Sequence, residues 1–179
     1  MPIPLKPPLS RNVEEGRTAA SAIDGVARKR RQGPNLKTRA LGYLARREHS
    51  RLELERKLAP HAQSSAELAA VLDTLEQCGF LSAVRMVEQL VHVRKSKFGS
   101  RRIVHELREK GIPENLIAAA LPNMKETEHD RAREVWRKRF KAMPADTKEL
   151  GRQMRFLMNR GFAADVIHHV LHHADEEIT

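Results

Sequence analysis

The sequence is poor in cysteine and has no long apolar run. Cys78 is the only thiol in 179 residues, which excludes a disulfide framework and a zinc site built on cysteines. Its apolar neighbours in LEQCGFL predict that this thiol is buried. No stretch approaches the roughly 20 apolar residues of a membrane-spanning helix, and prolines interrupt the start where a signal peptide needs a continuous apolar segment. The sequence therefore predicts a cytoplasmic protein that is not bound to a membrane.

Aromatic residues are also scarce, at 4%, and hydrophobic residues reach only 40% while charged residues make up 31%. This composition favours thin helix–helix contacts over one thick core. The 33 lysines and arginines exceed the 23 acidic residues, which gives a net charge of +10. Such a surplus favours polyanionic partners, because each phosphate that is neutralised releases counterions. Nucleic acids and acidic protein surfaces are both candidate partners.

Residues 1–35 differ from the rest of the chain. Four prolines fall within the first eight residues, and no helical period is sustained, so we expect a flexible extension. Near its end lies a compact basic cluster formed by Arg28, Lys29, Arg30 and Arg31. This cluster is either a DNA-contacting arm or a solubilising tail.

From residue 36 onward the apolar pattern is helical, and no strand pattern is present. Ser50, Ser64 and Asp146 each precede a glutamate by three residues, as N-caps do in capping boxes. Gly111 and Gly161 are each followed by an apolar residue, which is typical of left-handed helix C-caps. The sequence therefore predicts short helices with well-marked ends.

The helical pattern repeats along the chain. Leu107 and Gly111 recur 50 residues later as Leu157 and Gly161, and further apolar positions match at spacings of 47 and 49. We therefore expect an all-α fold, an elongated array of three tandem three-helix repeats with a flexible N-terminal extension. The predicted repeats are 36–81, 82–121 and 122–179. Because each is too small to fold securely alone, we expect neighbours to share apolar contacts, with flexible junctions near Gly79 and Pro122.

The second repeat carries most of the charge imbalance within the helical region, with eight basic and four acidic residues in 82–121. Arg101 and Arg102 open its middle helix. A positive charge there interacts unfavourably with the helix dipole and lowers the stability of the helix by roughly 0.3–1 kcal/mol per charge. An anion bound to these arginines and to the free backbone amides of the helix start would offset that cost. The alternative is a solvated cationic face.

Four stretches then closely resemble the RecX family, bacterial regulators of the RecA recombinase. They are ALGYLARREHSRLELERKL, LEQCGFL, VRKSKFGSRRIVHELREKGIPENLIAAAL and MRFLMNRGFAADVIHHVL, in that order. The segment from Gly99 to Ile112 carries the most specific signature. One segment departs from the family: an acidic pair followed by Arg-Phe-Ala is replaced by AVRMV at 83–87, which makes the second repeat more basic.

The resemblance implies tandem three-helix repeats that lie in the groove of a RecA–DNA filament. It implies a regulator, not an enzyme, that inhibits recombinase, ATPase and coprotease activities in recombination, DNA repair and the SOS response. It also implies a monomer without cofactors, and some relatives bind single- or double-stranded DNA directly. A stand-alone helical DNA-binding protein and a helical scaffold for another acidic protein are the alternatives.

The charge clusters and the matched family positions together give a candidate binding set for the filament or DNA. Its members are Arg46, Arg47, Arg51, Arg94, Lys95, Lys97, Arg101, Arg102, Arg108, Lys110 and Arg160.

Other motifs carry less weight. His168, His169, His172 and His173 include pairs four residues apart that could chelate a metal, but the glutamate of a catalytic zinc helix is missing, so we expect no metal. No phosphate-binding glycine loop is present, which leaves an intrinsic ATPase without support. Trp136 is expected to pack within the third repeat rather than to stack on bases.

Overall fold

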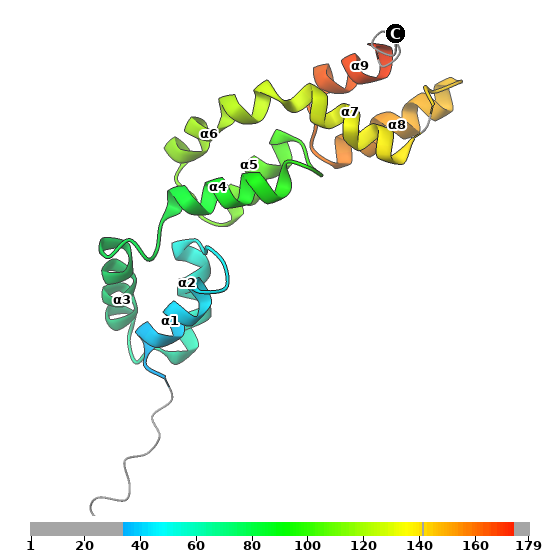
Figure 1. Ribbon diagram of the computed structural model, residues 1–179. Coiled ribbons are helices and arrows are strands. Elements are labelled where there is room, and N and C mark those ends of the chain that lie inside the picture. Colours follow the sequence, from blue (N-terminus) through cyan, green and yellow to red (C-terminus); the bar gives the residue numbers. More distant parts are fainter. Residues whose placement is uncertain (1–33, 141, 174–179) are drawn as a thin grey trace, which may run out of the picture. The chain divides into compact units, whose positions relative to one another are not determined.

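The computed structural model describes residues 34–140 and 142–173. Contacts group the chain from Leu36 onward into one unit. Its described residues form nine α-helices, one short 3-10 turn at Ala59–His61 and no strand (Figure 1). The predicted all-α class is therefore confirmed.

The helices fall into three successive groups of three. The first group contains α1 (Leu36–Leu44), α2 (Arg51–Leu58) and α3 (Ser65–Gln77). The second contains α4 (Ala83–Arg94), α5 (Ser100–Glu109) and α6 (Glu114–Glu126). The third contains α7 (Glu128–Arg139), α8 (Thr147–Asn159) and α9 (Ala164–His173). We call these groups repeats 1, 2 and 3. Because α6 continues through Pro122, the boundary predicted after residue 121 falls within a helix.

Side-chain caps start several helices where the sequence predicts them. Ser50 Oγ accepts from the Glu53 amide, and Glu53 Oε2 accepts from the Ser50 amide, each at 3.1 Å, so this capping box is complete. Ser64 and Asp146 also accept from the amide three residues later. In these two caps the glutamate carboxylate accepts instead from the residue before the cap.

Glycines end the middle helices of repeats 2 and 3. Gly111 has φ 70° and Gly161 has φ 82°, both in the left-handed region that favours glycine. The amides of Ile112 and Phe162 then reach back to the carbonyl five residues earlier, at 3.1 and 3.3 Å. This turn buries the side chains of Ile112 and Phe162 and thereby joins the second and third helices of each repeat.

Each repeat has its own apolar core. Leu54, Leu58 and Leu72 lie in that of repeat 1, Ile103 and Leu107 in that of repeat 2. The core of repeat 3 contains Leu157 and Trp136. The Nε1 of Trp136 donates a hydrogen bond to Gln153 Oε1 at 2.7 Å. The buried apolar residues form three separate clusters, one for each repeat, and the apolar contacts expected between neighbours stay a prediction. The contacts between neighbouring repeats include ion pairs and hydrogen bonds.

The prediction of a buried Cys78 was also wrong. Cys78 is the C-cap of α3 and is exposed, because the helix ends there in a turn at the surface. None of the helices within the described ranges has the length and apolar character needed to cross a membrane. The N-terminal cluster from Arg28 to Arg31 lies outside the described residues.

Candidate functional site

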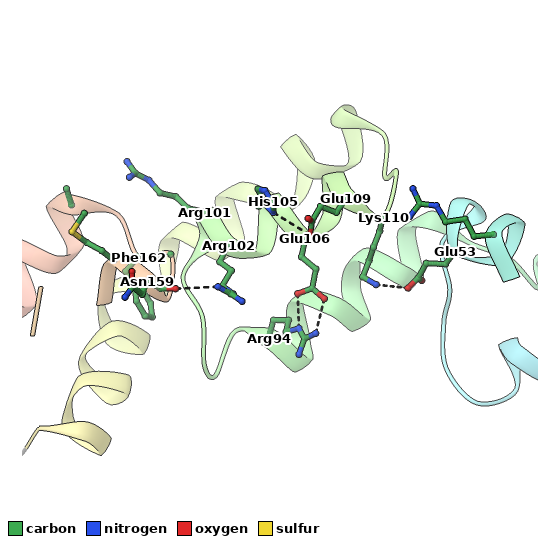
Figure 2. Close-up of a pocket in the computed structure, with 14 residues that line it drawn as sticks. Glu53, Arg94, Arg101, Arg102, His105, Glu106, Glu109, Lys110, Asn159 and Phe162 are labelled. Atoms are coloured by element: carbon green, nitrogen blue, oxygen red, sulfur yellow. Dashed lines mark hydrogen bonds and ion pairs between the residues drawn. The ribbon is translucent and has the colours of Figure 1, made fainter. Parts of the chain in front are cut away.

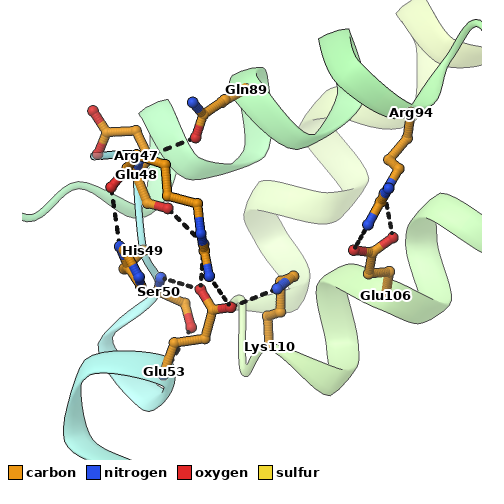
Figure 3. A network of polar contacts seen from close by, with 9 residues as sticks. All are labelled: Arg47, Glu48, His49, Ser50, Glu53, Gln89, Arg94, Glu106 and Lys110. Atoms are coloured by element: carbon orange, nitrogen blue, oxygen red, sulfur yellow. Dashed lines mark hydrogen bonds and ion pairs between the residues drawn. The ribbon is translucent and has the colours of Figure 1, made fainter. Parts of the chain in front are cut away.

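The junction between repeats 1 and 2 is closed by a salt bridge. Lys110, the C-cap of α5, places Nζ 2.6 Å from Oε1 of Glu53 in the first turn of α2 (Figure 3). Arg47 also pairs with this carboxylate at 3.2 Å. A Cβ atom added to Gly111 would lie 3.0 Å from Leu52 Cδ2, so the glycine turn sits close against α2. Lys110 and Arg47 therefore both pair with the Glu53 carboxylate at this junction.

The Glu53 carboxylate is strongly stabilised in its charged form. Burial alone would raise its pKa, but hydrogen bonds from Arg47, Lys110 and the Ser50 amide outweigh burial and lower the pKa to about 2. The ionised form of Glu53 is therefore favoured at this junction. It serves the α2 cap and the contact with repeat 2 at once.

A second contact at this junction involves Glu48. Its carboxylate accepts from Arg85 Nε at 2.7 Å. Its amide donates to Gln89 Oε1 at 3.1 Å (Figure 3). Arg85 belongs to the segment that departs from the RecX pattern, and Met86 beside it is buried. The departing segment therefore contributes to both the core of repeat 2 and the junction.

The junction between repeats 2 and 3 brings two backbones together. The Gly99 amide donates to the Arg160 carbonyl at 2.9 Å, and the Arg101 amide donates to the Gly161 carbonyl at 3.2 Å. A Cβ atom added to Gly99 would lie 2.4 Å from the Gly161 oxygen, and one added to Gly161 would lie 2.5 Å from Arg102 Cβ. Neither glycine can carry a side chain without separating the repeats.

The start of α5 already has an anion. Glu128, the first residue of α7, is buried, and its carboxylate accepts from the Ser100 amide at 2.8 Å and from Ser100 Oγ at 2.8–2.9 Å. The expectation of free amides at this helix start was therefore wrong for Ser100 and Arg101, because a carboxylate and a carbonyl of repeat 3 take their hydrogen bonds. A bound anion was one of the two alternatives that the sequence left open here, and the Glu128 carboxylate of the chain itself accepts from the Ser100 amide.

Arg131 is a second residue that sequence reasoning missed. Its Nη1 donates to the carbonyls of Lys95 and Phe98, both at 3.1 Å, and its Nη2 donates to the Met124 carbonyl. Burial lowers the pKa of Arg131, against the attraction of Glu128. No sequence motif marks this arginine, because its three acceptors lie in the segment after α4 and in the last turn of α6.

A cavity of about 990 Å³ is lined by residues of all three repeats (Figure 2). Four members of the candidate set line it: Arg94, Arg101, Arg102 and Lys110. The end near repeat 1 also holds carboxylates, including Glu53 and Glu106. The structure thus brings part of the candidate set together and reveals acidic neighbours that charge counting could not place.

Two of the cations that line the cavity, Arg94 and Lys110, are paired with acids. Arg94 Nε and Nη2 both donate to the Glu106 carboxylate at 2.9 Å, and these hydrogen bonds raise the pKa of Arg94 (Figure 3). Lys110 is paired with Glu53, as described above. These ion pairs make the two cations less available to a partner.

The opposite end of the cavity keeps its positive charge. Here Arg101 and Arg102 lie beside Asn159, Gly161 and Phe162 of repeat 3, with no carboxylate among these lining residues. Figure 2 shows Arg102 directed toward Asn159, whose carbonyl lies 3.4 Å from Nη1. Within the described residues, Arg101 is exposed and its side chain has no hydrogen bond or ion pair. We call Arg101 and Arg102 with the adjoining Arg160 the cationic junction.

The remaining candidates lie outside the cavity. Three of them pair with nearby acids: Arg47 with Glu53, Arg51 with Asp73 and Glu76, and Arg108 with Glu114. Another three are exposed and have no side-chain ion pair within the described residues: Arg46, Lys95 and Lys97. Arg160 Nη1 donates to the Lys97 carbonyl at 3.1 Å, and its guanidinium lies 4.5 Å from the centre of the Phe156 ring.

The histidines of α9 form ring contacts. The rings of His168 and His172 lie 4.1 Å apart, and that of His169 lies 5.0 Å from His129 of α7. The side chain of His173 lies outside the described residues. Among the side chains that are described, no group of three or more potential metal ligands is present.

Comparison with known proteins agrees with these observations. Residues 84–121 fit the family described as "RecX, second three-helix domain", and residues 126–171 fit "RecX, third three-helix domain". A "Regulatory protein RecX" from Leptothrix cholodnii is 55% identical over 143 residues, which cover 80% of this chain and 91% of that protein. The chain belongs to the RecX family.

Other RecX proteins extend the comparison. The "Regulatory protein RecX" of Neisseria meningitidis serogroup C is 41% identical over 143 residues, which cover 80% of this chain and 93% of that protein. The crystal structure of RecX from Lactobacillus salivarius has a TM-score of 0.65 at 20% identity, covering 75% of this chain and 91% of that one. The tandem array of three-helix units predicted from the sequence is thus the RecX fold, and the family is one of regulatory proteins.

Proposed function

We propose that this chain regulates the RecA recombinase by binding the RecA–DNA filament and inhibiting its recombinase, ATPase and coprotease activities. It acts in the cytoplasm as a monomer and catalyses no reaction of its own. The observation that carries this proposal is the mixed state of the cations that line the cavity: Arg94 and Lys110 are paired with acids, whereas Arg101 and Arg102 have no ion pair within the described residues. A cavity to which three repeats contribute supports binding to an extended partner.

The proposed mechanism depends on many modest contacts. Each repeat has its own core, so each presents a separate small surface, and three linked surfaces bind far more tightly than one alone. Inhibition then requires that the chain binds the inactive arrangement of the filament better than the active one. A binder with equal affinity for both would leave the filament's activity unchanged.

The test is a titration of the full chain into RecA filaments on DNA, with ATP hydrolysis and strand exchange as readouts. We expect both rates to fall as the chain approaches one copy per several RecA subunits. Unchanged rates at equal concentrations of chain and RecA would refute the proposal. A scaffold for another acidic protein would give that result and would be captured with its own partner instead.

The alternative of a stand-alone DNA-binding protein is tested by omitting RecA. That function requires tight binding to free DNA with a steep dependence on salt. Weak binding to free DNA together with strong inhibition of filaments would favour the filament as the target.

A further inference from the structure

The two junctions are built on one plan. Ser50 and Gly99 are the N-caps of α2 and α5, and Leu54 and Ile103 are the first buried apolar residues after them, 49 residues apart in both cases. In this register, the third helical position holds Glu53 in repeat 1 and an arginine, Arg102, in repeat 2.

The other side of each junction also corresponds. Lys110 and Arg160 are the C-caps of α5 and α8, and each precedes a glycine with positive φ. Between repeats 1 and 2, the C-cap cation meets the carboxylate at the third helical position, Lys110 to Glu53 at 2.6 Å. Between repeats 2 and 3, both of the corresponding residues are arginines. The second junction therefore lacks the acid that closes the first.

Glu128 explains how α5 tolerates this exchange. In α2, the carboxylate of Glu53 also caps the helix, by accepting from the Ser50 amide. In α5, Glu128 of repeat 3 accepts from the Ser100 amide and stabilises the helix start from outside. Position 102 is thus released from any capping role and can carry a cation.

Two of the three arginines of the cationic junction, Arg102 and Arg160, are oriented without being neutralised. The Arg102 guanidinium lies 4.8 Å from the centre of the Phe98 ring, close to the Asn159 carbonyl. Arg160 is held in the same way, by a carbonyl and the Phe156 ring. Within the described residues, neither has a carboxylate at ion-pair distance. Groups that are already oriented lose less entropy when they bind an anion.

We infer that the cationic junction binds a backbone phosphodiester of DNA, in the place that Glu53 fills at the other junction. Guanidinium groups match phosphate oxygens in bidentate geometry. Exposed Lys95 and Lys97 follow in the adjoining loop, and such a run of cations suits the repeating charge of a nucleic acid better than a single carboxylate. The inference rests on the proposed function only in taking this DNA to be that of the filament.

The experiment measures binding of the full chain to a fluorescent single-stranded oligothymidylate, without RecA, by anisotropy at several salt concentrations. Arg102→Glu restores the acid and should weaken binding about tenfold or more, with a shallower salt dependence. Lys148→Glu is the matched control, because it makes the same charge change at an exposed residue in the first turn of α8. The control should stay within about twofold of the unchanged chain.

The reverse exchange is a gain-of-function test. Glu53→Arg gives the first junction the charges of the second, and we expect the oligonucleotide to bind several-fold more tightly. Arg102→Gln removes the positive charge without adding a negative one, so it should weaken binding of the oligonucleotide less than Arg102→Glu does. Thermal unfolding of every variant verifies that it is folded.

Equal affinities of the Arg102→Glu and Lys148→Glu variants would overturn the inference. So would an Arg102→Glu variant that binds the oligonucleotide normally but no longer binds filaments, since the anion would then belong to RecA. The proposed function fails separately, when the unchanged chain does not inhibit filaments at all.

Discussion

Replacing Glu128 should destabilise the fold more than its position at a helix end suggests. The carboxylate is 2% exposed and satisfies two donors of Ser100, the amide and the hydroxyl. A buried donor left without a partner costs about 1–3 kcal/mol, and an anion at a partly buried helix start contributes up to ~2 kcal/mol. Release of the carboxylate from its buried site offsets part of this loss. For Glu128→Ala we therefore expect a loss of about 2–4 kcal/mol in the free energy of unfolding.

Urea unfolding, followed by circular dichroism, measures this loss. Glu126→Ala is the control, because Glu126 is exposed only two residues away and should change stability by no more than about 0.5 kcal/mol. A double-mutant cycle with Ser100→Ala should give a coupling of about 1–3 kcal/mol. Equal stabilities of the Glu128→Ala and Glu126→Ala variants would refute the role of Glu128 as the cap of α5.

Three further predictions concern the junctions. Gly99→Ala should cost about 2 kcal/mol of unfolding free energy, because the new Cβ meets the Gly161 carbonyl. Gly42→Ala, in the last turn of α1 where no atom lies within 4 Å of the new Cβ, should stabilise by about 0.5–1 kcal/mol. Equal effects in thermal unfolding would contradict the close contact of Gly99 with Gly161. Because the pKa of Glu53 is lowered to about 2 from an unfolded value of 4.5, its contribution of about 2–3 kcal/mol is complete above pH 4.5 and is lost as the pH falls to 2. Urea titrations at several pH values should show a flatter acid limb for Glu53→Gln than for the unchanged chain. Arg131→Met leaves the carbonyls of Lys95 and Phe98 without this donor and should speed hydrogen exchange in the α4–α5 loop, while Arg137→Met on the exposed face of α7 should not.

Local signals in the sequence predicted much of the fold. Capping side chains such as Ser50 and left-handed glycines such as Gly161 act within one helix end, so their spacing alone locates the helix boundaries. The recurrence of Leu107 as Leu157 likewise identified buried positions in two repeats. The polar contacts at the junctions were not predictable in this way, because they depend on which helix ends meet.

The candidate site shows the same limit. Counting charges pointed to Arg101, Arg102 and Arg51 alike. It could not tell that Arg51 has the partners Asp73 and Glu76 on another helix. Glu128 left one indirect signal, since α5 has no acidic residue in its first turn and so needs an anion from elsewhere. This anion, the Glu128 carboxylate, belongs to the next repeat, and a sequence pattern within one helix cannot identify it.

Co-sedimentation with RecA–DNA filaments tests the central claim most directly. The unchanged chain and a Lys148→Glu/Arg137→Glu control, altered only at exposed residues outside the cavity, should both pellet with filaments. An Arg101→Glu/Arg102→Glu variant with the same net charge should stay in the supernatant. If that variant pelleted as fully as the control, or if the unchanged chain did not pellet, the cationic junction would not be the surface through which this RecX protein acts.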